Sequence, residues 1–194
     1  MTKTRLEAFT DAVIAIIMTI LILGLEPPKA ATFAGLWELR YSFLVYILSF
    51  VSLAIYWNNH HHLFQIAKVI NGRVLWANFL FIFFLSLIPF VTQWVDGNLF
   101  ELAPEVTYGV VLMMADISYA ILLHELKKAN GPDSKIARAH DGYMKLRLTL
   151  SINTVGIVIG IFAPISILIF YIIGLIPWII PEKRIEKIFN EEQE

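Results

Sequence analysis

The stretch RLEAFTDAVIAIIMTILILGL, residues 5–25, decides the fold, because it predicts a helix that spans a membrane. A spanning helix needs roughly 20 predominantly apolar residues. The chain then continues into Glu26-Pro27-Pro28, where the prolines end the helix. Arg5, Glu7 and Asp11 lie in its first turns. A carboxylate inside an apolar span is costly and normally faces protein or a water-filled path. This segment is therefore predicted to be the functional helix rather than a lipid anchor.

The composition of the chain also indicates a membrane protein. Of its 194 residues, 58% are hydrophobic and only 16% are charged, and a soluble domain of this size could not bury so much apolar surface. The formal net charge of −1 gives no indication of nucleic-acid binding. The chain has no cysteine, which excludes disulfides and thiolate metal sites. The first span lacks the features of a cleavable signal peptide, so we expect it to remain in the mature protein.

Apolar runs recur along nearly the whole length and predict an all-α integral membrane protein with six transmembrane helices. Pro164 divides the last uncharged run, which is too long for one span, into two short helices. A single long, kinked helix is the alternative interpretation of that run. The predicted single transmembrane domain covers residues 1–181, with residues 182–194 as a tail. Its spans are expected at about 6–25, 37–63, 74–95, 105–126, 144–163 and 165–181.

The distribution of basic residues predicts the orientation. With six spans, all 15 lysines and arginines except Lys29 and Arg40 fall on one side of the membrane. The positive-inside rule places that side, with both termini and the tail, in the cytoplasm. The outer loops carry acidic residues that would raise the local cation concentration or simply form a solvated surface.

One face of the first span is aliphatic with a single hydroxyl. Residues three, four and seven positions apart share a helix face, which groups Ile16, Thr19, Ile20 and Leu23. One such face cannot enclose a pore, but several copies around a symmetry axis could form stacked rings that gate by dewetting. An aliphatic stripe is also typical of ordinary helix packing, so the spacing by itself leaves both interpretations open.

Polar residues of three spans are expected at a similar depth on the cytoplasmic side. Asp11 follows Glu7 by four positions, which is unfavourable for like charges unless a donor intervenes. Arg5 or a histidine is the expected donor. A linked cluster would satisfy every buried polar group and could act as a structural clamp, a gate hinge or a proton-sensitive element. The predicted members are Arg5, Asp11, His60, His61, His62 and Asn78.

The three adjacent histidines do not predict a metal site. Successive helical residues differ by about 100° in direction, so three neighbours cannot converge on one ion. No metal motif accompanies them. Asp116, in the fourth span, is another candidate functional carboxylate, and its partner cannot be named from the sequence.

Three motifs of the sequence resemble those of the transmembrane protein 175 family of potassium channels, in its small prokaryotic form. Arg5-x-x-x-Phe9-Thr10-Asp11 is similar to the family signature R-x-x-x-F-S-D, with threonine in place of the common serine. Trp57-x-x-His60-His61-His62-x-Phe64 and the segment from Asn78 to Ser86-Leu87-Ile88-Pro89-Phe90 are similar to the segments that follow it. The likeness covers the whole chain in length, layout and motif order.

The resemblance implies a homotetramer in which the first helix of each subunit lines a central pore. It implies that Ile16, Ile20 and Leu23 form the hydrophobic constriction and that Thr19 contributes to cation preference. Arg5, Asp11 and the histidine–asparagine group would hold the helix in register. The implied partners are the lipid bilayer of a prokaryotic plasma membrane and permeant potassium ions, with no cofactor.

The first functional hypothesis is therefore a passive, potassium-preferring cation channel. Proton conduction on the same scaffold is the first alternative, because titratable groups lie along the helix. A secondary transporter, from a different class, is permitted by six spans and Asp116, although no inverted repeat of broken helices is detectable. No catalytic motif favours a membrane enzyme.

Overall fold

The structure is a computed structural model and describes residues 2–139 and 144–179. All regular elements in these ranges are helices. In chain order they are α1 (Lys3–Leu23), α2 (Phe33–Glu38), α3 (Arg40–Ile66), α4 (Gly72–Ser86), α5 (Ile88–Val95), α6 (Leu102–Asn130), α7 (Lys135–Ala139), α8 (Lys145–Gly160) and α9 (Ser166–Ile179).

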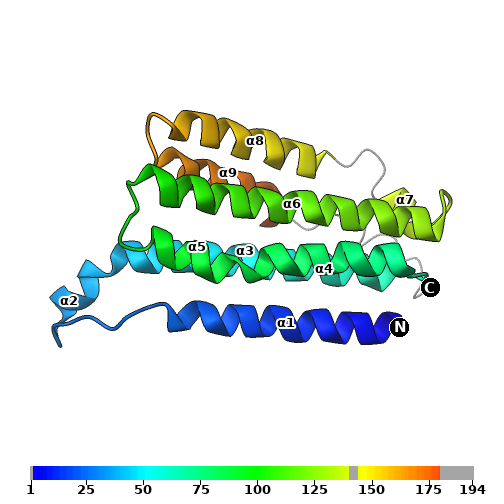
Figure 1. Ribbon diagram of the computed structural model, residues 1–194, viewed down its shortest axis with the longest axis horizontal. Helices are drawn as coiled ribbons and strands as arrows, with labels where there is room; N and C mark the ends of the chain where they lie inside the picture. The colour runs from blue at the N-terminus through cyan, green and yellow to red at the C-terminus, as the bar shows by residue number, and fades with distance from the viewer. Residues whose placement is uncertain (1, 140–143, 180–194) are drawn as a thin grey trace.

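The long helices lie side by side along the longest axis of the subunit (Figure 1). Helix α1 forms one outer edge and packs against α3, α4 and α5, while α8 and α9 lie at the opposite edge against α6. The core between these edges is apolar, and its largest fully buried side chains include Phe64, Phe81 and Tyr108. One edge of the subunit is therefore formed by the helix that carries the candidate pore face.

Within the described residues, four segments are long and apolar enough to cross a membrane, by length and composition: α1, α3, α4 with α5, and α6. The third of these is interrupted at Leu87, two residues before Pro89, which lies in the first turn of α5. A proline is tolerated there because the first amides of a helix have no partner within it. The span therefore continues from α4 into α5 with one local break.

Side-chain caps fix the turns at one end of the bundle. The Asn71 side chain accepts hydrogen bonds from the backbone amides of Arg73 and Val74 at 3.0 Å, and so begins α4. Helix α6 ends at Asn130, and the next residue, Gly131, has a φ of +89°, a conformation that glycine adopts readily. Just before it, Asn130 binds the backbone of Lys68 and Val69 through both ends of its amide. The α3–α4 loop is thus held against the end of α6.

Helices α8 and α9 form a closely packed hairpin. The chain turns between Gly160 and Ser166, around Pro164, so these residues do not form one long kinked helix. Glycines allow the close approach: a Cβ at Gly156 would lie 2.5 Å from the Phe170 Cβ. At 16 and 14 residues, both helices are shorter than the four long segments. The predicted tail, residues 182–194, and the end of the predicted sixth span lie outside the described residues.

Candidate functional site

Helix α1 is divided into a buried face and an uncovered face. Leu6, Thr10, Ile14, Ile17 and Leu21 are buried against the rest of the subunit. The side chains of the predicted pore face point away from it: Ile16 is 58% exposed, Ile20 43% and Leu23 80%, and Thr19 is also exposed. No other segment among the described residues covers this face, which leaves it available to lipid, to water or to another subunit.

The hydroxyl of Thr19 is bonded to its own helix. It donates to the backbone carbonyl of Ile16 at 2.8 Å. A hydroxyl has two acceptor lone pairs besides its hydrogen. Its oxygen therefore stays able to accept from water or to face a cation on the uncovered side of the helix.

A chain of hydrogen bonds fixes the buried face of α1 at its N-terminal end. The Asn78 amide donates to Thr10 Oγ1 at 2.9 Å, and Thr10 in turn donates to the Leu6 carbonyl. His60 Nε2 lies 2.9 Å from Asn78 Oδ1, and because that oxygen can only accept, Nε2 carries the proton. Thr10, Asn78 and His60 are at most 1% exposed. Three helices, α1, α3 and α4, are thus joined by satisfied buried polar groups.

Aromatic rings enclose the histidine of this chain. The His60 ring stacks on Phe64, with centroids 4.4 Å apart, and on Phe81 at 6.0 Å. A neutral imidazole packs well between such rings, whereas a charged one would lose its hydration there. The contacts therefore hold His60 in the orientation that donates to Asn78.

The donor to Asp11 differs from the donors expected from the sequence. Trp57 Nε1 donates to Asp11 Oδ1 at 3.0 Å, where we expected Arg5 or a histidine. The Trp57 indole also stacks on the His61 ring, with centroids 5.6 Å apart. Residues of α3 therefore contact α1 in two separate ways. His60 acts on Thr10 through Asn78, and Trp57 binds Asp11 directly.

Among the described residues, the other members of the predicted cluster make no hydrogen bond to Asp11 or Asn78. Arg5 is exposed, and the described residues show no hydrogen bond or ion pair between it and Asp11. His61 bonds to Gln65 one turn along α3, and the buried Nδ1 of His62 has no hydrogen-bond partner among the residues that the structure describes. Phe9, the remaining signature residue, is 47% exposed, and its ring lies perpendicular to that of Phe79 with the centroids 5.9 Å apart. The sequence predicted one continuous network, whereas the structure shows two separate sets of contacts.

Sequence reasoning missed two participants. Trp57 begins the motif that contains the three histidines, but its role as a donor to Asp11 depends on how α3 is rotated against α1. Thr10 was noted as a signature residue and not as a network member, although its polar side chain among apolar neighbours was a usable signal. Among the residues that the structure describes, no group of three His, Cys, Asp or Glu side chains is placed to hold a metal ion.

The sequence is similar to those of known potassium channels. Residues 5–89 match the family model described as endosomal/lysosomal potassium channel TMEM175. A potassium channel of Chryseobacterium sp. (strain P1-3) is 44% identical over 192 residues, covering 98% of this chain and all of the relative. A potassium channel of Streptomyces collinus is 35% identical over 92 residues, covering 45% of each chain.

A solved structure gives the fold comparison. The crystal structure of a lysosomal potassium-selective channel TMEM175 homolog from Chamaesiphon minutus superposes with a TM-score of 0.67. The match covers 91% of this chain and 97% of that chain at 19% sequence identity. The two proteins therefore share the same fold.

Proposed function

The chain belongs to the TMEM175 potassium-channel family, and from this premise we propose that it is a passive, potassium-preferring cation channel. The observation that carries the proposal is the uncovered aliphatic face of α1, with Thr19 among its residues. In the proposed pore, Ile16, Ile20 and Leu23 form the hydrophobic constriction. Thr19 contributes to the preference for potassium. The family and the curated relatives are channels and not enzymes.

The proposed assembly is a homotetramer with α1 of each subunit around a central axis. Small residues allow transmembrane helices to approach closely. Ala8, Ala12 and Ala15 recur at helical spacing and are all exposed in the subunit, next to the proposed pore face. These alanines support close contact between α1 and a neighbouring subunit, while Ile16, Ile20 and Leu23 face the axis.

The proposed topology has six spans in the plasma membrane of a prokaryote, with both termini in the cytoplasm. It adds α8 and α9 to the four long spans. At 1.5 Å per residue these two helices are about 24 Å and 21 Å long, so they are short for a hydrocarbon core of about 30 Å. Local thinning of the bilayer or snorkelling of Lys145 and Arg147 can accommodate such a mismatch.

Potassium flux into liposomes tests the proposal. The purified protein is reconstituted, and flux is measured under a potassium gradient beside a mass measurement of the assembly. We expect passive flux and the mass of four 22.2 kDa chains. A reversal potential that follows a pH gradient instead would favour proton conduction. Flux that saturates and requires a second solute would contradict a channel and favour a transporter.

The variant Thr19→Val tests the selectivity assignment. It keeps the side-chain shape and removes the hydroxyl, so we expect flux to persist while the potassium-over-sodium permeability ratio falls. A fall of about two- to ten-fold is expected, since one net hydrogen bond is worth about 0.5–1.5 kcal/mol. Reversal potentials with potassium on one side and sodium on the other measure the ratio.

Thr107→Val is the matched control for this variant. The Thr107 hydroxyl also donates to a carbonyl of its own helix, at 2.8 Å, but it lies on α6. If the potassium-over-sodium permeability ratio is unchanged in Thr19→Val, or falls equally in both variants, Thr19 does not contribute to selectivity.

A further inference from the structure

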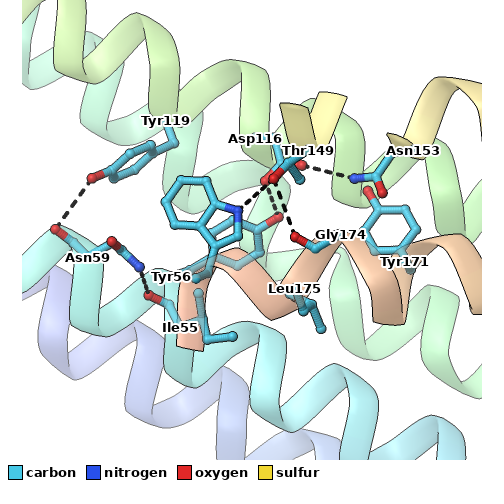
Figure 2. Close-up of a pocket in the computed structure, with 11 residues that line it drawn as sticks. Ile55, Tyr56, Asn59, Asp116, Tyr119, Thr149, Asn153, Tyr171, Gly174 and Leu175 are labelled. Atoms are coloured by element: carbon cyan, nitrogen blue, oxygen red, sulfur yellow. Dashed lines mark hydrogen bonds between the residues drawn. The ribbon is translucent and has the colours of Figure 1, made fainter. Parts of the chain in front are cut away.

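The polar cluster around Asp116, inside the subunit, is closed by the subunit's own side chains (Figure 2). The Tyr56 hydroxyl donates to Asp116 Oδ1 at 2.7 Å, and the Asn153 amide donates to Oδ2 at 3.3 Å. These are the partners that the sequence could not name, and they join α3, α6 and α8 through one carboxylate. The space beside them has a volume of about 10 Å³ and mostly apolar walls, so it has room for at most a single water molecule. This cluster therefore holds helices together and does not form a ligand site.

A larger cavity lies at the end of the bundle that carries α7 (Figure 1). Its volume is about 450 Å³, which is within the range of ligand pockets. Three segments line it: the end of α3 with the loop that follows, the turn from Asn130 to Ser134, and α7. The cavity is therefore large enough for a small organic group.

Hydrogen bonds fix the walls of this cavity. The Asn130 side chain accepts from the backbone amides of Lys68 and Val69 at 2.8 and 2.9 Å, and donates to the Val69 carbonyl at 2.9 Å. In the turn after α6, the Ser134 hydroxyl donates to the Gly131 carbonyl at 2.6 Å. The loop after α3 and the turn after α6 are thus joined, and the cavity is formed before any ligand binds.

The charged side chains at the cavity are mainly basic. Three basic side chains and one carboxylate line it: Lys68, Lys135, Arg138 and Asp133. Lys68 and Arg138 are exposed, and within the part of the chain that the structure describes neither side chain makes an ion pair. An excess of positive charge in a concave surface raises the local concentration of anions. The cavity therefore fits an anionic ligand.

The position of the cavity favours a lipid over a free anion. Helices α3 and α6 are both long and apolar enough to cross a membrane, and they end beside the cavity, at Ile66 and Asn130. The ends of spanning helices lie at the depth of the lipid headgroups. Val69, an apolar residue of the cavity wall, is 50% exposed. A phospholipid offers both a charged phosphate and an apolar part at this depth, whereas a free phosphate offers only the charge.

From the volume, the basic lining and the depth of the cavity, we propose that it binds the headgroup of one anionic phospholipid. Lys68 and Arg138 bind the headgroup phosphate, since a guanidinium matches two phosphate oxygens and an ammonium acts as a point charge. Val69 contacts the apolar part of the lipid next to the headgroup. Basic pockets at the cytoplasmic ends of transmembrane helices are a known setting for such headgroups. The assignment to the cytoplasmic leaflet rests on the proposed topology, but none of the proposed pore residues lines the cavity.

The test is the thermal unfolding of the full chain, purified in an uncharged detergent. The midpoint is measured as dioleoylphosphatidylglycerol is added to the micelles, beside equal additions of dioleoylphosphatidylcholine, at constant ionic strength. A ligand that binds only the folded state raises the midpoint with its concentration. At ten times the dissociation constant we expect phosphatidylglycerol to raise the midpoint by roughly 3–6 °C over phosphatidylcholine.

Two variants locate the effect at the cavity. Lys68→Gln and Arg138→Gln each remove one charge from an exposed side chain, so the fold should be kept. We expect each to weaken the apparent affinity for phosphatidylglycerol about five-fold, the factor that one basic residue contributes beside an anionic lipid surface.

Lys128→Gln and Arg73→Gln are the matched controls. They change the same residue types, and both side chains are exposed at the same end of the bundle but outside the cavity. Both controls should keep the full affinity for phosphatidylglycerol, because a general attraction of the lipid to basic residues would be weakened equally in all four variants.

Three results would overturn the proposal. The first is an equal rise of the midpoint with phosphatidylglycerol and phosphatidylcholine, which would mean that the headgroup charge is not recognised. The second is the same rise when sodium phosphate or glycerol 3-phosphate is added at the concentration of the lipid, which would make the ligand a free phosphate. The third is an equal affinity in the cavity variants and in their controls. Because this measurement uses no ion flux, it and the proposed channel function can fail independently.

Discussion

Replacing Ile20 by alanine is expected to raise the potassium flux of the reconstituted protein about ten-fold, since lowering a barrier by about 1.4 kcal/mol changes a rate by that factor. Ile20 is 43% exposed on the uncovered face of α1, between Ile16 and Leu23. In the proposed tetramer, its side chains form an apolar ring that resists wetting, and a hydrophobic constriction gates by excluding water. Truncation to alanine widens the ring and admits water.

Ile22→Ala is the control for this experiment. Ile22 lies on the same helix and is 45% exposed, almost the same as Ile20, but it is outside the face shared by Ile16, Ile20 and Leu23. Liposome flux is compared at equal amounts of reconstituted tetramer. If the two variants conduct equally, or if neither differs from the wild type, Ile20 does not belong to a constriction.

Replacing Asn78 by leucine is expected to destabilise the subunit and to abolish potassium flux. The side chain keeps a similar size, but His60 Nε2 loses its acceptor and Thr10 Oγ1 loses its donor. The His60 donor is left without a partner, which costs about 1–3 kcal/mol, and Thr10, which keeps its bond to the Leu6 carbonyl, loses one further hydrogen bond of about 0.5–1.5 kcal/mol. For a chain of this length 1 kcal/mol corresponds to about 2–4 °C. We expect the unfolding midpoint to fall by roughly 5–15 °C.

Two further variants make this prediction specific. Ser86→Ala lies on the same helix and removes an exposed hydroxyl that donates to the carbonyl of Phe83, one turn back in the helix, so its midpoint should change little. The double variant His60→Leu with Asn78→Leu removes both partners, and replacing both by apolar groups is often nearly neutral. It should be more stable than Asn78→Leu alone. A double variant that is less stable would mean that the histidine contributes through packing between Phe64 and Phe81 rather than through the hydrogen bond.

The helical architecture could be predicted from the sequence because its signals are local. Long apolar runs indicate spans, and prolines indicate where they break. Pro164 lies in the turn between α8 and α9, where the sequence predicted a division, whereas the interruption beside Pro89 falls inside a stretch predicted as one continuous span. The motif around Arg5, Phe9, Thr10 and Asp11, together with the segments around Trp57 and Asn78, also indicated the family.

The partners of the buried polar groups could not be predicted, because they depend on the rotation and depth of helices that are distant in the chain. Trp57 and Asp11 are 46 residues apart, Tyr56 and Asp116 are 60 apart, and Asn153 and Asp116 are 37 apart. A rotation of one helix by a single residue, about 100°, would give each of these groups a different neighbour.

The sequence by itself determined that this chain is a bundle of apolar helices and which residues of the first helix share a face, since hydrophobic length and helical period are properties of consecutive residues. Only the tertiary structure decided that the face with Ile16, Thr19, Ile20 and Leu23 is the one left uncovered by the subunit. It also decided that Trp57, and not Arg5, binds Asp11, and that Asp116 lies beside a cavity with Asn153. All three outcomes follow from the packing of α1 and α6 against their neighbours, which buries some faces, exposes others and pairs polar groups across helices.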